Sequence, residues 1–283
     1  MMQVVSAADE FQQQCFQLRC SGQVTALVPT MGYFHQGHLS LMRWARENAD
    51  TVLVSLFVNP AQFGPSEDLD RYPQNLERDM DLAGEEGVDI LFTPHSQEMY
   101  AADHDTWVDV PGLSANLCGR SRPHFFRGVC TVVCKLLNMA LPHKAVFGQK
   151  DWQQMVVITR MVRDLNLPVA IVGRPIVREG DGLAMSSRNA YLNNEERRQA
   201  AHIYAGLQNV QKWVRDGEKD AAALQTGLEQ YYAQNIPAGR IDYVHFVHPW
   251  ELTPVERVES QALAAVAVHI GSARLIDNVL VEG

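Results

Sequence analysis

Apolar runs and amphipathic segments alternate along the first 174 residues of the chain. The run TVLVSLFV at 51–58 is almost continuously apolar, as is typical of a strand that is buried on both faces. In the preceding segment, 38–49, apolar residues recur at the spacing of one helix face. Strands that alternate with helices of about 10 to 15 residues predict βαβ units, and therefore a parallel sheet.

The same patterns predict the other elements of this part of the chain. Further strands are expected at 24–29, 88–94, 144–148 and 168–173. Further helices are expected at 74–87, 127–140 and 151–166. Right-handed crossovers bring the carboxyl ends of such strands to one edge of the sheet, where ligands bind. The expected fold class is α/β, with a Rossmann-like, doubly wound parallel sheet.

The pattern changes at Pro175. A Gly/Asp turn and a Ser-Ser-Arg segment come first, followed by a helical stretch at about 195–216 and then by IDYVHFVHPWELTPV. This mixture predicts a smaller α+β domain at the C-terminal end. The expected domains are therefore 1–174 and 175–283.

Composition narrows the class of protein. With 283 residues, 46% of them hydrophobic, the chain is long enough for a full globular core. A net charge of −9 disfavours nucleic-acid binding by phosphate neutralisation. Five cysteines without a C-x-x-C pair favour reduced, mostly buried thiols. The start lacks a basic region and a long apolar run, and ALAAVAV is too short to span a bilayer, so we expect a soluble, cytoplasmic protein.

Two histidines, His35 and His38, flank Gly37 where the first long strand gives way to a helix. Histidines three residues apart can bind a metal, but a zinc site needs a third ligand and H-E-x-x-H is absent. At a helix N-terminus, neutral imidazoles can instead donate hydrogen bonds to phosphate oxygens. Taken alone, the pair could also simply cap the helix.

Two other segments are suited to phosphate binding, although neither G-x-G-x-x-G nor a P-loop occurs. Lys150 and Asp151 follow a strand and open a helix, which places a positive charge at that corner. Ser186, Ser187 and Arg188 offer two hydroxyls and a guanidinium within one loop, a set suited to polyphosphate. Each segment alone could be an ordinary cap or polar loop, but three in one chain favour a nucleotide site.

Several motifs together resemble the pantothenate synthetase (pantoate–β-alanine ligase) family of the HxGH nucleotidyltransferase superfamily. They cover essentially the whole chain: PTMG…H-x-G-H (29–38), FVNPAQF (57–63), RP…FRGV (122–129), FGQKDWQQ (147–154), REGDGLAMSSRN (178–189) and ARLIDN (273–278). The resemblance implies that ATP converts the carboxylate of pantoate into pantoyl adenylate, with release of pyrophosphate and with Mg²⁺ present. The amine of β-alanine then displaces AMP and gives pantothenate.

The resemblance also implies roles for particular residues. His38 would act as proton donor, with His35 and Lys150 as its catalytic partners. The residues implied to bind ATP are Met31, Gly32, His35, Gly37, His38, Gly148, Lys150, Asp151, Val177, Met185, Ser186, Ser187 and Arg188. Those implied to bind substrate are Gln62, Gln154, Asn59 and Arg122. Asp79 matches a carboxylate that could help to hold the metal, possibly through water.

The chain departs from the family pattern at two positions. Gln149 replaces a glutamate, and Phe125 stands where the family has a histidine, with His124 one residue earlier. These departures leave open a catalytically impaired nucleotide-binding homologue as the alternative to an active ligase.

Two other enzyme classes are disfavoured by the sequence. A class I aminoacyl-tRNA synthetase would need a basic region, whereas 175–283 has more acidic than basic residues. A nucleotidyltransferase acting on a phosphate substrate would need basic residues in place of Gln62 and Gln154. The resemblance further implies a homodimer without nucleic-acid or membrane partners. We also expect the loop at 59–70 to become ordered over the site when substrate binds.

Overall fold

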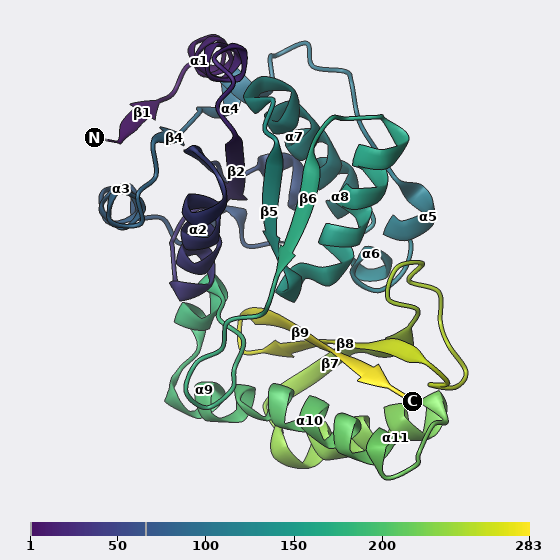
Figure 1. Ribbon diagram of the computed structural model, residues 1–283. Helices are drawn as coiled ribbons and strands as arrows, with labels where there is room; N and C mark the ends of the chain where they lie inside the picture. The colour runs from purple at the N-terminus through teal and green to yellow at the C-terminus, as the bar shows by residue number, and fades with distance from the viewer. Residues whose placement is uncertain (1, 66) are drawn as a thin grey trace. The chain divides into compact units, whose positions relative to one another are not determined.

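The computed structural model describes residues 2–65 and 67–283, and the chain forms two compact units (Figure 1). The first unit runs to Ser114 and continues over Arg122–Gln149 and Gln154–Pro175. The second comprises Ala115–Ser121, Lys150–Gln153 and Ile176–Gly283. Two short segments that precede Pro175 in the sequence thus belong to the second unit, because their contacts are made there.

The sheet of the first unit is parallel throughout its described strands, in the order β1-β4-β3-β2-β5-β6. The central strands are almost wholly buried, as the apolar run at 51–58 predicted; Val52, Leu53 and Val54 are each 0% exposed. The strands are β1 (Gln3–Val5), β2 (Thr25–Thr30), β3 (Thr51–Leu56), β4 (Ile90–Phe92), β5 (Lys144–Gly148) and β6 (Ala170–Arg174). The short edge strand β1 has no counterpart among the predicted elements.

The strand order reverses between β2 and β5. From β2 the chain moves outward through β3 and β4, and it then crosses to β5 and β6 on the other side. β2 and β5 pair directly, with Ala26 opposite Lys144 and Leu27 opposite Ala145. In open α/β sheets the crevice at such a reversal is the usual ligand site. This topology confirms the predicted Rossmann-like fold and draws attention to the residues that follow β2 and β5.

Helix α2 is amphipathic, and its apolar face builds one core of this unit. Leu39, Met42 and Ala45 pack with Val28 and Val54 of the sheet. The helices of this unit and its connections are α1 (Ala8–Cys20), α2 (Gln36–Asn48), α3 (Leu76–Glu85), α4 (Ser96–Met99), α5 (Pro111–Ser114), α7 (Phe125–Ala140) and α8 (Trp152–Asp164). Short 3-10 turns occur at η1 (Pro60–Gln62), η2 (Leu69–Arg71) and η3 (Gln149–Asp151).

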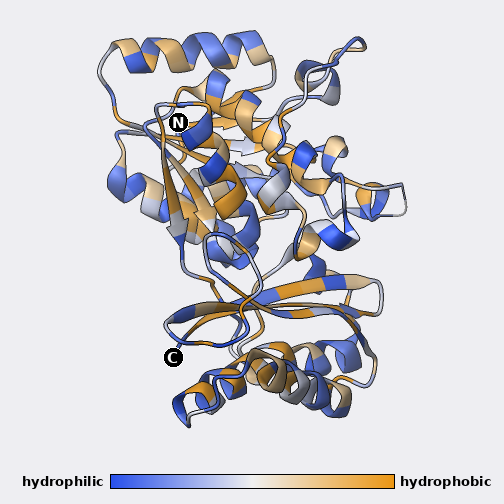
Figure 2. Cartoon of the chain, turned by 90° about the vertical axis from the view of Figure 1, so that its right-hand side faces the viewer, coloured by the Kyte–Doolittle hydropathy of each residue, from blue (hydrophilic) through white to orange (hydrophobic). Residues whose placement is uncertain are grey.

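The second unit has an antiparallel sheet, β7 (Gly239–Val247), β8 (Gln261–Ile270) and β9 (Ala273–Glu282), in that order. The helical stretch predicted at 195–216 is two helices, α9 (Asn194–Ala200) and α10 (His202–Arg215). Helices α10 and α11 (Ala221–Asn235) share a core with the sheet, which includes Leu207, Leu228 and Val266. Short elements at α6 (Cys118–Ser121) and η4 (Ser187–Tyr191) complete the unit. The sheet strands are largely orange in Figure 2, whereas the helices mix blue and orange, as expected for helices with one buried face.

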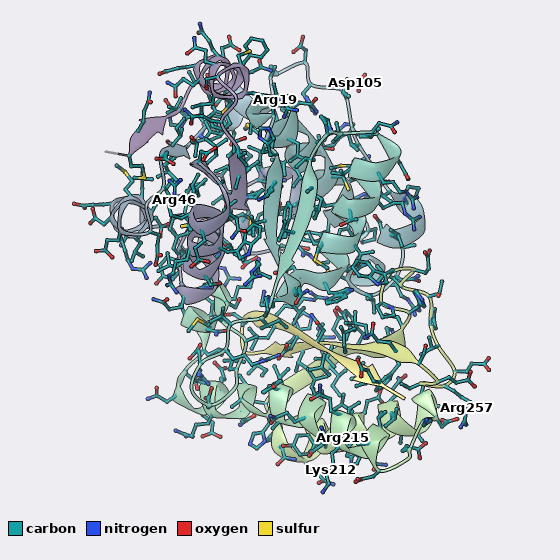
Figure 3. All side chains as sticks on the ribbon, viewed as in Figure 1. Arg19, Arg46, Asp105, Lys212, Arg215 and Arg257 are labelled. Carbon is teal, nitrogen blue, oxygen red and sulfur yellow. The ribbon has the colours of Figure 1, made fainter. Side chains whose placement is uncertain are left out.

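Arg46 is a charged side chain outside the predicted site that stabilises local structure. Arg46, labelled in Figure 3, pairs with Asp89 at 2.8 Å and donates to the carbonyls of Ala49 and Asp50, so it fastens the end of α2. The five cysteines form no disulfide: Cys15, Cys118 and Cys130 are buried, Cys134 is half-buried and Cys20 is exposed. Within the described ranges, no helix has both the length and the apolar character needed to cross a membrane.

Candidate active site

His35 and His38 lie where β2 leads into α2, and backbone hydrogen bonds fix both rings. His35 is the N-cap of α2, and its Nδ1 accepts a hydrogen bond from the Gly37 amide at 3.1 Å. Nδ1 of His38 accepts from the amide of His35 at 3.4 Å, and the two rings stack with centroids 4.1 Å apart. A nitrogen that accepts a hydrogen bond carries no proton. Each ring therefore presents Nε2, and not Nδ1, as the nitrogen that can donate to an anion.

Asp79 fixes the turn that delivers these histidines. Its carboxylate oxygens accept the amide of Tyr33 at 2.6 Å and that of Phe34 at 2.7 Å. Gly32 and Tyr33 both have positive φ, of 82° and 52°, so the turn occupies the left-handed region and needs such support. Burial is the largest influence and raises the pKa of Asp79 above its ordinary value, although these hydrogen bonds and Arg78 act in the opposite direction.

The expected metal role of Asp79 stays a prediction, but the structure argues against direct coordination. Its side chain is 1% exposed and each oxygen already accepts a backbone amide. In the described part of the chain, no group of three or more His, Cys, Asp or Glu side chains could hold a metal ion.

Gln62 and Asn59 form a buried amide cluster after β3. Asn59 donates from Nδ2 to Gln62 Oε1 at 3.1 Å and to the carbonyl of Gly128 at 3.2 Å. The side chain of Gln62 in turn donates to the sulfur of Met31 at 3.0 Å. Three of the predicted site residues are thus in direct contact.

Tyr100 and Gly128 complete this cluster, and neither of them was assigned a role from the sequence. The hydroxyl of Tyr100 donates to Asn59 Oδ1 at 2.8 Å, which fixes the orientation of that amide. Burial raises the pKa of Tyr100 to about 12, so the hydroxyl keeps its proton. Gly128 allows α7 to approach η1 closely, because a Cβ there would overlap the carbonyl of Ala61. Tyr100 lies outside the motifs quoted above, and Gly128 lies within RP…FRGV but has no side chain that could suggest a role. Both come from segments distant from Asn59 in the sequence.

Arg122 is held by neighbouring side chains. Its Nε donates to Glu67 Oε1 at 2.8 Å, its Nη2 donates to the carbonyl of Gln62, and its guanidinium lies 3.8 Å from the ring centroid of Phe125. Phe125, one of the two departures from the family pattern, therefore supports Arg122 by a cation–π contact. The adjacent His124 is exposed.

Gly148 ends β5 and Gln149 opens η3, at the strand-order reversal. The side chain of Gln149, the other departure, lies against the open face of Gly173 in β6. Gln154 is half-buried in the first turn of α8. That Gln154 and Gln62 both bind pantoate remains a prediction.

The remaining predicted residues belong to the second unit. Lys150 pairs with Asp151, with Nζ and Oδ2 3.3 Å apart. Ser186 caps η4, and its hydroxyl accepts the amide of Arg188 at 3.3 Å, while Ser187 is buried. The carbonyl of Val177 accepts the amide of Met185 at 3.0 Å, which joins the two ends of this loop.

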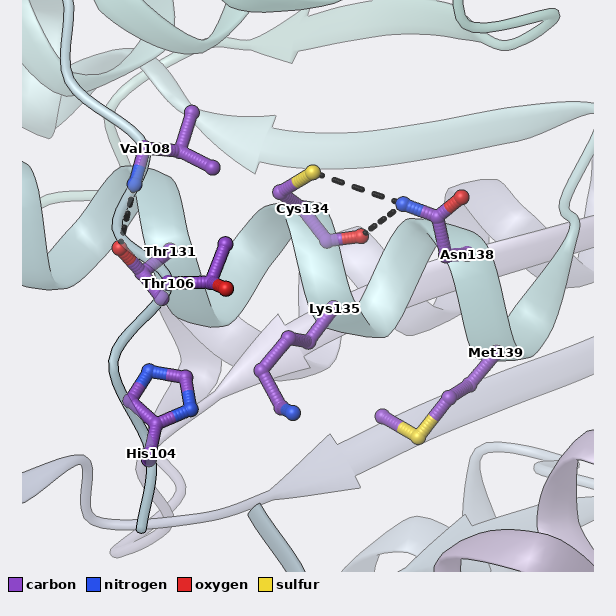
Figure 4. A pocket seen from close by; sticks show the side chains of 8 residues that line it. All are labelled: His104, Thr106, Val108, Thr131, Cys134, Lys135, Asn138 and Met139. Atoms are coloured by element: carbon purple, nitrogen blue, oxygen red, sulfur yellow. Dashed lines mark hydrogen bonds between the residues drawn. The ribbon is translucent and has the colours of Figure 1, made fainter. Parts of the chain in front are cut away.

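A cavity of about 360 Å³ lies elsewhere in the first unit, against α7 (Figure 4). It is lined by His104, Thr106, Val108, Thr131, Cys134, Lys135, Asn138 and Met139. Nε2 of His104 is buried there without a hydrogen-bond partner among the described residues. No predicted site residue lines this cavity, so it is separate from the candidate site.

Comparison with known proteins decides the family. The model of the family described as pantoate-beta-alanine ligase matches residues 3–280. The chain belongs to the pantoate-beta-alanine ligase family. This confirms the resemblance of its motifs, and it confirms that the protein is an enzyme of the carbon–nitrogen ligase class.

Similar proteins match over almost their whole length. Pantothenate synthetase of Maridesulfovibrio salexigens is 57% identical over 281 residues, which cover 99% of this chain and 100% of that protein. The crystal structure of pantothenate synthetase from Thermus thermophilus is 43% identical with a TM-score of 0.92, covering 98% of this chain and 99% of the other. The pantoate-beta-alanine ligase of Francisella tularensis, complexed with beta-gamma ATP and beta-alanine, is 30% identical with a TM-score of 0.81. That match covers 99% of this chain and 98% of the Francisella chain.

Proposed function

We propose that this ligase joins pantoate to β-alanine in two steps that use ATP. A carboxylate oxygen of pantoate attacks the α-phosphorus of ATP, and the bond to pyrophosphate breaks. The amine nitrogen of β-alanine then attacks the acyl carbon of pantoyl adenylate, AMP leaves with the electron pair, and the ammonium proton passes to solvent. The Francisella relative, complexed with beta-gamma ATP and beta-alanine, supports these substrates.

The observation that carries the proposal is the hydrogen bonding of the two histidines. Backbone amides occupy Nδ1 of His35 and of His38, so Nε2 is the nitrogen of each ring that can donate. At the N-terminus of α2, these Nε2–H groups act together with the helix dipole as donors to ATP phosphates. Donors fixed in advance stabilise the charge that builds on the phosphates as pyrophosphate leaves. His38 is proposed as the principal donor and His35 as its partner.

The second unit contributes cationic and hydroxyl donors. Lys150 is proposed to bind ATP phosphates, together with Ser186, Ser187 and Arg188. Gly148, Asp151, Val177 and Met185 are proposed to line the nucleotide pocket, as are Met31, Gly32 and Gly37. Ser186 caps η4 with its own hydroxyl, which holds this segment in one conformation.

Pantoate is proposed to bind at the amide cluster of Gln62 and Asn59, with Gln154 and Arg122 as further contacts. Neutral amides both donate and accept, which suits an acid that also carries hydroxyl groups. They do not stabilise the reactant carboxylate as strongly as a cation would, so more of the binding energy serves the transition state. The hydrogen bonds from Tyr100 and to Gly128 keep this cluster in place.

Mg²⁺ is proposed to arrive with ATP, held by phosphate oxygens and water. The described residues offer no cluster of three ligands, and both carboxylate oxygens of Asp79 accept backbone amides, which supports a metal ion held mainly by the nucleotide. Few protein ligands are usual for Mg²⁺ bound to a nucleotide. On the basis of the family resemblance, we also propose that the protein is a homodimer and that it is cytoplasmic.

The test is pyrophosphate release from ATP with pantoate alone, followed by AMP and amide formation after β-alanine is added. His38→Ala is expected to lower pantoate-dependent pyrophosphate release roughly 10²- to 10³-fold, as for loss of one preorganised donor. Gln36→Ala, at the neighbouring exposed position, is the matched control and is expected to retain activity. If the well-folded wild-type protein binds ATP without turnover, it is a catalytically impaired homologue and the proposal fails.

A further inference from the structure

Two adjacent residues of β9, Asp277 and Asn278, are buried polar groups for which the proposed chemistry gives no role. They are 3% and 7% exposed, in a strand whose other buried side chains are apolar. Burying a carboxylate and an amide costs free energy unless both are fully hydrogen-bonded. The partners that satisfy them therefore indicate what this pair of residues does.

Asn278 holds the main chain of Lys150. Its Nδ2 donates to the carbonyl oxygen of Lys150 at 3.0 Å, across 128 positions of sequence. The residues after Lys150 are fixed in the same unit, since the Trp152 indole donates to the carbonyl of Pro249 at 2.8 Å. Gln153 donates to the carbonyl of Asn116 at 2.7 Å. The backbone from which the Lys150 side chain projects is therefore anchored to the second unit.

Asp277 holds the beginning of the segment that leads to Ser186. Its carboxylate accepts two hydrogen bonds from Arg178, at 2.6 and 3.0 Å, and also the amide of Asn278 at 2.8 Å. The guanidinium of Arg178 lies 3.5 Å from the ring centroid of Tyr204, and it donates to the carbonyl of Gly182 at 3.1 Å. In addition, β9 packs against η4, which contains Arg188. A bidentate ion pair of this kind fixes direction as well as distance.

We propose that Asp277 and Asn278 are positioning residues for adenylation: one strand holds Lys150 by its backbone and the Ser186–Arg188 segment through Arg178. The inference rests on the proposed function, in which both segments bind ATP phosphates. Their donors are far apart in sequence, in segments that begin at Lys150 and at Ser186. Rigid attachment to neighbouring positions of one strand sets their spacing, and it leaves the donors little to reorganise when charge develops.

The test separates the two half-reactions. Asn278→Ala is expected to slow pyrophosphate release from ATP and pantoate about 10- to 100-fold, the range for a misplaced catalytic group. Aminolysis of preformed pantoyl adenylate by β-alanine is expected to stay within about twofold of wild type, because the β- and γ-phosphates have already left. Equal losses in both half-reactions, or no loss in either, would overturn the inference.

Asn235→Ala is the matched control, since that amide also donates to a backbone carbonyl, of Tyr231 at 2.8 Å, in helix α11. It is expected to leave both half-reactions unchanged. Asn278→Ser keeps a hydrogen-bond donor with less loss of volume, and it replaces the alanine variant if that variant does not fold. If Asn278→Ala folds, an adenylation rate of Asn278→Ser between those of wild type and Asn278→Ala supports the inference. If Asn278→Ala does not fold, a loss in Asn278→Ser that is confined to adenylation supports it. A wild-type adenylation rate in Asn278→Ser with a folded, slow Asn278→Ala also supports donation as the cause.

A double-mutant cycle distinguishes this inference from the function on which it rests. If Asn278 acts through Lys150, Asn278→Ala lowers adenylation less than about twofold further in a Lys150→Ala background. Fully multiplicative losses would show that Asn278 acts independently and would overturn the inference. If Lys150→Ala alone adenylates pantoate at the wild-type rate, the phosphate-binding role of Lys150 fails instead.

Discussion

The carboxylate of Asp79 fixes the backbone turn that immediately precedes His35 and His38. A turn with two successive residues at positive φ is strained at Tyr33, which has a Cβ. Two short hydrogen bonds from the backbone of that turn to one buried carboxylate offset the strain. Backbone amides point at the Nδ1 atoms of both histidines, which leaves Nε2 of each ring as its donor nitrogen. Chemistry at the site thus depends on a residue that need not touch the substrate.

Asp79→Asn is expected to lower both stability and adenylation. An amide has one acceptor oxygen, so its NH₂ group would face a backbone N–H of Tyr33 or Phe34. The free energy of unfolding should fall by about 1–3 kcal/mol, as for a buried donor left unsatisfied. Urea denaturation and pyrophosphate release measure the two effects. Asp81→Asn, at an exposed position of the same helix, is the control, and equal stability of the two variants would contradict this role.

The close approach of α7 to η1 shapes the amide cluster. Gly128 lies against the backbone of Ala61 and Gln62, and its carbonyl accepts a hydrogen bond from Asn59. The absence of a side chain at Gly128 therefore determines where two of the proposed pantoate-binding residues stand. Helix and turn come from different parts of the sequence, so their packing is a tertiary property.

Gly128→Ala is expected to force the helix and the turn apart, since the new Cβ would lie 2.7 Å from the nitrogen of Gln62. Overpacking of this kind costs about 1–3 kcal/mol of stability, and displacement of Gln62 should raise KM for pantoate. Thermal melting and steady-state kinetics measure the two effects. Gly84→Ala in α3 meets no atom within 4 Å and should instead stabilise by about 1 kcal/mol. A Gly128→Ala variant as stable as Gly84→Ala would refute the steric argument.

The sheet of the second unit is fastened by an ion pair across its surface. Asp242 lies at an irregularity of β7, and its carboxylate accepts hydrogen bonds from Arg274 on β9 at 2.7 and 3.0 Å and from Ser121 at 3.0 Å. Burial raises the pKa of Asp242, but these hydrogen bonds outweigh it and hold the pKa below its ordinary value of 3.8. A lowered pKa in the folded state means that ionised Asp242 stabilises the protein above that ordinary value.

Asp242→Asn is expected to destabilise the protein by about 2 kcal/mol at neutral pH, as for loss of charge-assisted hydrogen bonds. The difference from wild type should shrink as pH falls below 3.8, because protonation removes the same charge from the wild-type protein. Urea midpoints from pH 7 down to about pH 3 test this. Asp105→Asn, at an exposed position labelled in Figure 3, should show no such dependence. A constant difference between Asp242→Asn and wild type at all pH values would contradict the ion-pair argument.

The enzyme as a whole is expected to need Mg²⁺ for its reaction but not for its fold. The part of the chain that the structure describes has no cluster of three metal ligands, and its cores are apolar. EDTA should therefore stop pyrophosphate release while leaving the melting temperature of the ligand-free protein unchanged. A fall in that melting temperature on adding EDTA would reveal a structural metal and contradict the expectation.

We also expect the loop at 59–70 to close over the site when the substrates bind. Glu67 of this loop pairs with Arg122, and Phe63 packs edge-on against Tyr72 with ring centroids 6.1 Å apart. Ser66 lies outside the described residues. Amide exchange over 59–70 is expected to slow when ATP and pantoate are added, because closure would exclude water. Unchanged exchange would rule closure out.

The sequence by itself determined the fold class, the family and most of the candidate residues. A continuous apolar run predicts a strand buried on both faces, such as β3, and apolar residues at the helical period predict a helix such as α2. Motifs such as PTMG…H-x-G-H are also local, and the resemblance that they carry agrees with the family model, which matches residues 3–280. Elements with weak patterns were missed, and the short β1 is the clearest case.

Tertiary structure alone decided which residues support those motifs. Asp79 meets Tyr33, Tyr100 meets Asn59, and Asn278 meets Lys150 across 46, 41 and 128 positions. Such contacts leave no periodic signal, because each depends on the path of the backbone between its partners. The reversal of strand order beside β2 has the same origin, since strand patterns specify burial but not neighbours. Local patterns therefore pointed to the groups that are proposed to react, and long-range packing decided how those groups are held.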